Sequence, residues 1–195
     1  MRIETDKMVT LVLRLLDEDS SFLRDRVQYA DPESPLENLI VTLLPMIAEE
    51  VILAAEPKEI DEYEDFDAEI EWIEPGHGAV ELPPDFLRFR CFRMSDWSRK
   101  VTEPLSAEGE NYMLYARNYS GRFRGRKRSP AVVITAAEKG ARLEFFGSLD
   151  PGAYPVETGY IPMPQEDEPG MIRIPRALIL RVAEAIAERI KKIRS

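Results

Sequence analysis

The sequence predicts an α+β fold in which helices come first, antiparallel strands fill the middle and one amphipathic helix ends the chain. Helical apolar spacing dominates residues 1–55, alternating apolar residues mark strands within residues 69–161, and residues 172–195 return to helical spacing. Strands that follow one another without intervening helices favour antiparallel pairing. With 195 residues the chain can bury one sizeable core, so we expect a single domain with a sandwich-like middle.

The N-terminal part begins with two predicted helices. From Asp6 onward, Met8, Val12, Leu15 and Leu16 recur at helical spacing. A second, short helix is expected over residues 22–27, because Ser20 and Ser21 offer caps before its apolar residues.

A longer helix is predicted to begin at Ser34. Ser34 is the expected N-cap, Pro35 fits the first helical position, and Glu37 completes a capping-box spacing. One apolar face comprises Leu36, Ile40, Leu43, Leu44, Ile47, Val51 and Ala54. A proline in mid-helix costs about 3 kcal/mol, so Pro45 predicts either a kinked helix compensated by packing or two helical pieces.

The middle of the chain reads as strands. An acidic linker over residues 56–68 precedes a short alternating stretch, "AEIEWIE", and a turn over residues 75–78. The next strand is expected to place Leu87, Phe89 and Cys91 on one face, and Arg88, Arg90 and Phe92 on the other.

Three more strands are expected before the final helix. They cover residues 130–137, 141–148 and 154–162, with a hairpin turn over residues 138–140. A Pro-rich acidic loop then leads to the C-terminal helix. Its apolar stripe comprises Leu178, Val182, Ile186, Ile190 and Ile193, and either packs on the N-terminal helices or meets a second subunit.

The charges of the chain are segregated. The net charge is -10, which repels polyanions from the molecule as a whole. Residues 56–71 hold nine acids and one base, whereas residues 117–128 hold six bases and no acid. The bases are Arg117, Arg122, Arg124, Arg126, Lys127 and Arg128. Such a layout suits self-assembly, in which the basic loop of one subunit meets the acidic segment of its neighbour, and it equally suits a solvated surface.

The basic loop also carries aromatic residues. Tyr112, Tyr115, Tyr119 and Phe123 are interleaved with its cations, and stacking faces beside cations are typical of single-strand nucleic-acid binding. Alternatively, the three tyrosines form one face of a short helix that packs on the sheet and leaves an exposed basic tip. The six basic residues are therefore candidates for either a nucleic-acid contact or a subunit contact.

Catalytic patterns are scarce in the sequence. His77 is the only histidine, and its setting, "EPGHG", predicts a surface turn residue. Cys91 alternates with apolar residues and reads as a small core residue. The acids Asp61, Glu62, Glu64 and Asp65 could supply ligands to a divalent cation, although they lack the spacing of a calcium loop. We therefore expect a non-enzymatic protein without a cofactor.

Targeting signals are also lacking from the sequence. No apolar run approaches the roughly 18 residues of a membrane span, and residues 1–10 do not read as a signal peptide. A single cysteine cannot form an internal disulfide, which agrees with a reducing compartment. We expect a cytoplasmic or virion protein that contacts no membrane.

Residues 80–146 carry a resemblance to a known family. The stretch "LPPDFLRFRCFRMSDWSRKV" is followed by "NYMLYARNY", "SPAVVIT" and "RLEFF". This order resembles the head-to-tail connector (ring or adaptor) proteins of crAss-like and related tailed bacteriophages and prophages. The strand entry at residues 82–88 and the later Trp97, Arg99 and Val101 carry the pattern, as does a Tyr/Asn-rich segment at residues 112–119.

The resemblance implies a structural virion protein. Such a protein forms a homo-oligomeric ring between the portal and the tail, dodecameric when seated on a portal, with the DNA channel nearby. Its expected partners are further copies of itself and the portal and tail proteins, with DNA in the channel as a further contact. The expected location is the neck of the virion, after a period in the host cytoplasm. A nucleic-acid-binding module that uses residues 117–128 is the alternative.

Overall fold

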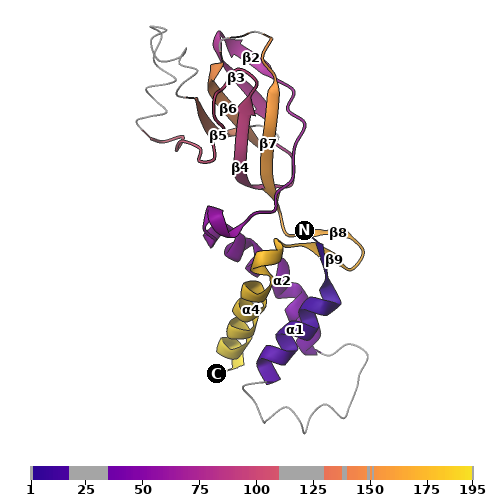
Figure 1. Cartoon of the computed structure of the whole chain (residues 1–195). Coiled ribbons are helices and arrows are strands. Elements are labelled where there is room, and N and C mark those ends of the chain that lie inside the picture. The colour runs from indigo at the N-terminus through magenta and orange to yellow at the C-terminus, as the bar shows by residue number, and fades with distance from the viewer. Residues whose placement is uncertain are drawn as a thin grey trace. The chain divides into compact units, whose positions relative to one another are not determined.

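The chain divides into two compact units. The computed structural model describes residues 2–17, 35–109, 130–137, 140–148, 150 and 152–194. One unit comprises Met1–Glu62 and Met163–Ser195, and the other comprises Tyr63–Pro162 (Figure 1). Both ends of the chain therefore build the first unit, here called the helical unit, and the middle builds the second, called the β-rich unit. The predicted α+β class is confirmed; that the units fold as a single domain stays a prediction.

Three helices pack together in the helical unit. They are α1 (Thr5–Asp17), α2 (Pro35–Ala54) and α4 (Ile179–Arg194), which follows a 3₁₀ turn, η2 (Arg176–Leu178) (Figure 1). Each helix buries one face, as the helical spacing predicted. The buried residues include Met8, Val12 and Leu16 of α1, Ile40, Leu44 and Ile47 of α2, and Val182, Ile186 and Ile190 of α4. Ile193, predicted to continue the stripe of α4, is exposed.

Helix α2 continues through Pro45. It does not separate into two pieces, because the helix is unbroken from Pro35 to Ala54. A proline removes the hydrogen bond to the carbonyl four residues earlier, which here belongs to Val41. Pro45 and Val41 both lie on the exposed side of α2, where solvent can reach the freed carbonyl group. The predicted short helix over residues 22–27 lies outside the described residues.

A small sheet in the helical unit was not predicted. Its strands are β1 (Arg2–Glu4), β9 (Met171–Arg173) and β8 (Glu166–Glu168), in the order β1-β9-β8. Asp167 joins them through ion pairs of 2.7 Å to Arg2 and 3.2 Å to Arg173. The predicted acidic loop therefore contains a strand, and the C-terminal helix begins at Ile179 rather than at residue 172. Three-residue strands are too short to show an alternating pattern.

Two antiparallel sheets build the β-rich unit. The four-stranded sheet has the order β2-β3-β6-β5, and β4 pairs with β7 in the second sheet (Figure 1). The bounds are β2 Glu71–Glu74, β3 Gly76–Glu81, β4 Phe86–Met94, β5 Ala131–Ala137, β6 Gly140–Ser148 and β7 Pro155–Pro162. The predicted strands over residues 130–162 are confirmed. Ala137 lies opposite Gly140, as the predicted hairpin requires.

The two sheets of the β-rich unit share one core. Its buried members come from both sheets and from the segments around them: Phe66, Val80, Leu82, Phe89, Phe92, Met94, Trp97, Val132, Leu143, Phe145, Ala153 and Tyr160. Phe145 is central, with its ring centroid 5.5 Å from those of Trp72 and Phe92 and 6.2 Å from that of Trp97. The sandwich-like arrangement that the sequence predicts is therefore present, and Trp97 has a structural place in it.

Strand β4 departs from the predicted alternation. Phe89 and Phe92 both belong to the shared core, whereas Cys91 is buried beside Gly159 and Tyr63. The register shifts between Phe89 and Cys91, as at a β-bulge. An extra residue in one strand reverses which side chains face the core, so the prediction that Phe92 faces away from Phe89 is wrong. Phe92 instead fills the core.

None of the helices in the described ranges combines the length and the apolar character needed to cross a membrane.

Candidate functional site

His77 does not lie in a surface turn. It is the second residue of β3 and is 8% exposed, so the predicted surface position is wrong. The turn is shorter than expected: Pro75 and Gly76 form it alone, because Glu74 already pairs with His77. A proline followed by a glycine with φ of 83° is the combination typical of a type II turn. The turn therefore ends before His77, which joins the strand.

Two carboxylates flank the His77 ring. Its Nδ1 lies 3.4 Å from Oε1 of Glu74, and its Nε2 lies 3.2 Å from Oε2 of Glu144. The ring stacks on Phe146, with centroids 4.4 Å apart. Only a doubly protonated imidazole can donate to both carboxylates at once. With both ring nitrogens and the ring face engaged and the residue buried, this cluster has the character of a structural link between β2, β3 and β6.

The pKa of Glu144 is lowered in this cluster. The hydrogen bond from His77 lowers the pKa of Glu144 below its ordinary value of 4.5, and the charge of His77 and the Thr135 hydroxyl act in the same direction against the effect of burial. A lowered folded-state pKa adds stability that is present above pH 4.5 and is lost as the pH falls through the folded pKa.

Replacing Glu144 with glutamine should therefore reduce both stability and its acid sensitivity. Glu144→Gln is expected to lower the free energy of unfolding by about 1–2 kcal/mol at neutral pH, because a hydrogen bond to a charged group is lost. The difference from wild type should shrink below pH 4.5, as measured by urea unfolding across pH. Glu81→Gln, at the exposed end of β3, is the control. Equal losses at neutral and acidic pH would contradict the role given to the Glu144 charge.

Cys91 and the four acids considered as cation ligands do not form a catalytic or metal-binding group in the described residues. Burial raises the pKa of the Cys91 thiol, as expected for a core cysteine. Of the acids considered as cation ligands, Asp61 and Glu62 belong to the helical unit and Glu64 and Asp65 to the β-rich unit. Glu62 accepts a hydrogen bond from the Arg176 main chain at 2.9 Å. Within the ranges that the structure describes, no three His, Cys, Asp or Glu side chains form a group that could hold a metal ion.

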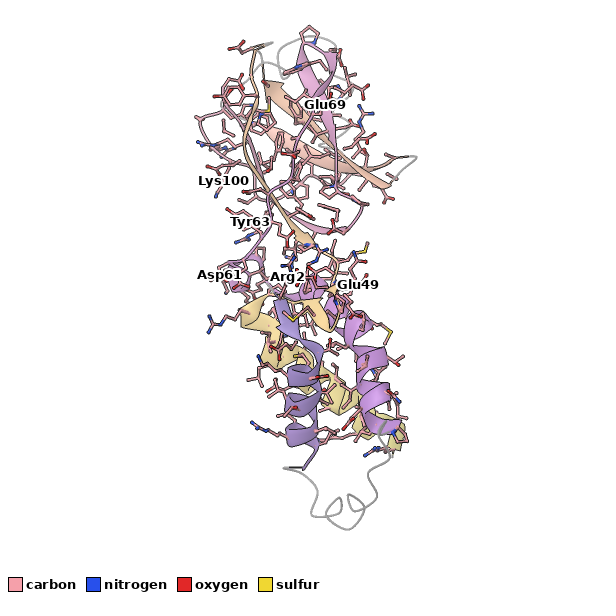
Figure 2. The ribbon with its side chains drawn as sticks, turned by 90° about the vertical axis from the view of Figure 1, so that its right-hand side faces the viewer. Arg2, Glu49, Asp61, Tyr63, Glu69 and Lys100 are labelled. Atoms are coloured by element: carbon pink, nitrogen blue, oxygen red, sulfur yellow. The ribbon has the colours of Figure 1, made fainter. Side chains whose placement is uncertain are left out.

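The predicted acidic linker has two structural halves. The first half belongs to the helical unit, where the turn Pro57–Glu59 is closed by a capping box between Glu56 and Glu59. The second half runs beside β7 of the β-rich unit. There the main chain of Glu64 exchanges two 2.9 Å hydrogen bonds with that of Tyr160. Figure 2 shows Tyr63 and Glu69 well separated along this unit. The exposed acids of the second half, Asp65, Asp67 and Glu69, therefore belong to a segment that pairs with β7.

A groove opens between this segment and the first half of β7. Its volume is about 550 Å³, and its walls are residues 63 and 65–68 on one side and residues 155–158 on the other. Asp65 and Asp67 are exposed, and Tyr63 and Val156 are each 40% exposed. Glu157 pairs with Arg93 at 3.0 Å and with Lys100 at 3.4 Å. We call this feature the edge groove; it offers carboxylates beside accessible apolar surface.

The edge groove exists because the Thr158 side chain bonds the Phe66 main chain in place of a main-chain pair between the two residues. The Thr158 hydroxyl accepts a 3.0 Å hydrogen bond from the Phe66 main-chain N–H and donates a 2.9 Å bond to the Phe66 carbonyl. The acidic segment is therefore held away from β7 at this point, whereas at Tyr160 it is paired directly.

The main chain of Thr158 faces the edge groove. The N–H and C=O of Phe92 both bond to Val101, so Phe92 and Thr158 form a pair of β4 and β7 without mutual hydrogen bonds. In such a pair the main-chain groups point outward. Among the residues that the structure describes, no main-chain hydrogen bond outside the strand pairs reaches Thr158. This part of β7 therefore faces the acidic segment, which it contacts through the Thr158 side chain and not through main-chain pairs.

The basic residues proposed from the sequence cannot be placed beside these features. Arg117, Arg122, Arg124, Arg126, Lys127 and Arg128 lie outside the described residues. Their role as a nucleic-acid or subunit contact stays a prediction. Of the two charged segments, only the acidic one, residues 56–71, lies within the described residues. Of this segment, residues 63 and 65–68 line the edge groove.

Comparison of the sequence with models of known protein families and with curated proteins found no match.

Proposed function

We propose that the protein is a structural subunit that acts by binding other protein chains, as a head-to-tail connector of a tailed bacteriophage. The observation that carries this proposal is the edge groove, which combines exposed carboxylates with accessible apolar side chains. Accessible apolar side chains rimmed by charged residues are suited to a protein contact.

The chemistry of the described residues supports the same reading. His77, the single histidine of the chain, is buried between two carboxylates and an aromatic ring, and the single cysteine is packed against a glycine. Both residues are engaged in holding the β-rich unit together. The exposed charged side chains are therefore groups that can bind other protein chains, as is typical of an assembly protein.

The proposed assembly is a ring of identical subunits between the portal and the tail. Segregated charges favour this, because an acidic segment on one subunit and a basic segment on the next make a head-to-tail contact, and such contacts form a ring when the rotation between subunits closes. On a portal the ring is dodecameric, with DNA in its channel. The protein then resides in the neck of the virion, and in the host cytoplasm before assembly.

Co-expression with the portal protein encoded beside it tests the proposed function. The two proteins are expected to co-purify, and electron microscopy of the complex should show a ring of this protein on one end of the portal. The complex should weaken as salt is raised, since exposed charges set its register. Failure to co-purify at low salt, together with a monomeric mass for the isolated protein at every concentration, would contradict the proposal.

A further inference from the structure

We propose that the exposed side of helix α2 binds the same helix of a second copy of this chain, antiparallel to it and related by a two-fold axis at Met46. The inference goes beyond the proposed function, because it concerns the free protein and uses the helical unit, whereas the proposed function rests on the edge groove of the β-rich unit. A two-fold contact joins the same surface of both subunits.

Helix α2 carries a second apolar stripe besides the one that is buried in the helical unit. Met46 is 45% exposed, Leu53 is 51% exposed and Leu39 is partly exposed. These residues stand seven apart, which is the spacing at which two helices pack along each other. Thr42 lies between the first two, and its hydroxyl already donates a 2.8 Å hydrogen bond to the Asn38 carbonyl. A helix that is apolar on two sides is typical of one that is covered on both sides.

The spacing of this stripe favours a second copy of the chain as its occupant. Leu39 and Leu53 lie seven residues to either side of Met46. When two α2 helices pack antiparallel with Met46 opposite Met46, each Leu39 therefore faces Leu53 of the other copy. The stripe is about 21 Å long at 1.5 Å per residue, and its three apolar residues all meet apolar partners. The stripe is thus complementary to itself.

The charges beside the stripe favour the antiparallel orientation. Glu49 and Glu50 are exposed and flank the stripe on either side, and α2 contains no Lys or Arg. In a parallel pair the acids of both copies would lie together and repel each other. In the antiparallel pair they lie level with Leu43 and Thr42 of the other copy, so the acids of the two helices are separated.

Helix α4 supplies the opposite charge. It runs antiparallel to α2, because Arg181 pairs with Glu59 and Arg189 pairs with Glu50, each at 3.3 Å (Figure 1). The C-terminal end of α4 therefore extends past Glu50 toward the N-terminal half of α2. This end carries three exposed bases: Lys191, Lys192 and Arg194. Glu49 and Glu50 of the other copy approach the same part of α2, so the two-fold pair brings opposite charges together.

Charges placed on the two-fold axis test the inference. Sedimentation equilibrium of the wild-type chain in about 0.3 M salt, which screens contacts between exposed charged segments, should show a reversible monomer–dimer equilibrium. Met46→Lys and Met46→Glu should each associate about tenfold more weakly, because residue 46 meets itself and like charges would lie in contact. Leu180→Lys is the control and should associate like wild type, since Leu180 is a 53% exposed residue of α4 outside the stripe.

Mixing the two Met46 variants separates a lost contact from a misfolded chain. An equal mixture of Met46→Lys and Met46→Glu should form heterodimers about as tightly as wild type forms its dimer, because opposite charges then meet at the axis. Two misfolded variants would not recover on mixing.

Disulfide cross-linking tests the antiparallel orientation. Leu39→Cys and Leu53→Cys, mixed in equal amounts and oxidised, should give linked heterodimers, whereas each variant alone should give few linked dimers, because residue 39 meets residue 53 and not itself. The native cysteine, Cys91, is buried and does not compete. Efficient linking of each variant with itself would contradict the orientation.

Three further results would overturn the inference. If wild type stays monomeric in 0.3 M salt yet forms a ring on the portal, the proposed function holds and this contact does not. If both Met46 variants dimerise like wild type, the dimer uses another surface. If both variants are monomeric, unfold at lower urea than wild type and stay monomeric when mixed, the stripe is covered within its own chain. A wild-type dimer that fails to bind the portal, in contrast, would contradict the proposed function alone.

Discussion

Phe145→Ala is expected to lower the free energy of unfolding of the β-rich unit by about 3–5 kcal/mol. The ring is fully buried at the centre of the core that the two sheets share, and it contacts the rings of Trp72, Phe92 and Trp97. Truncation removes these contacts and leaves a cavity that rigid neighbours fill only in part. The loss should appear in urea unfolding monitored by tryptophan fluorescence, since two of the three ring neighbours are tryptophans.

An exposed aromatic residue of the same unit gives the control for Phe145→Ala. Tyr154 is 62% exposed, and Tyr154→Ala is expected to change stability by no more than about 0.5 kcal/mol. If Phe145→Ala unfolds at the same urea concentration as Tyr154→Ala, the two sheets do not depend on a common core.

Gly78→Ala is expected to destabilise the same unit by about 1–3 kcal/mol, although it adds a single methyl group. Gly78 lies directly opposite Phe145 in the pairing of β3 with β6. A Cβ at this position would stand 2.5 Å from the Cζ atom of the Phe145 ring, far closer than van der Waals contact. The ring is fully buried among three other aromatic rings, so it has little room to move aside. Gly152→Ala, whose added Cβ would meet an ordinary contact of 3.4 Å, should be nearly neutral in the same urea unfolding experiment.

The two substitutions should also be coupled. In a Phe145→Ala background the ring that clashes with residue 78 is absent, so Gly78→Ala should cost little there. A double-mutant cycle measures this directly. If Gly78→Ala costs the same free energy with and without the ring, the close approach of Gly78 to Phe145 is not the reason for the glycine.

The helices and the longer strands could be predicted because their patterns repeat. Helix α2 presents several turns of apolar residues, and β5 and β6 are long enough to show strand character between turn residues. Strands β1, β8 and β9 have three residues each and depend on pairing with distant segments. The bulge in β4 could not be predicted either, because an extra residue leaves composition unchanged while it reverses the side-chain alternation.

The candidate site was visible in the sequence only in part. The acidic segment and the basic segment stand out by charge alone. The edge groove, in contrast, arises where Phe66 meets Thr158, 92 positions later, through a hydroxyl group. No local pattern predicts such a contact. His77 was misplaced for a different reason: Gly78 was read as part of a turn, whereas it serves the close approach of Phe145.

Zero-length cross-linking between two isotopic forms of the full chain tests the central claim most directly. A carbodiimide joins a carboxylate to a nearby lysine, and Lys127 is the single lysine of the basic segment. In a mixture of labelled and unlabelled protein, we expect cross-linked peptides that join Lys127 of one form to an acid of residues 56–71 of the other, and their loss in high salt. The absence of mixed-label products, or cross-links only within one chain, would contradict assembly through the acidic segment of one subunit and the basic segment of the next.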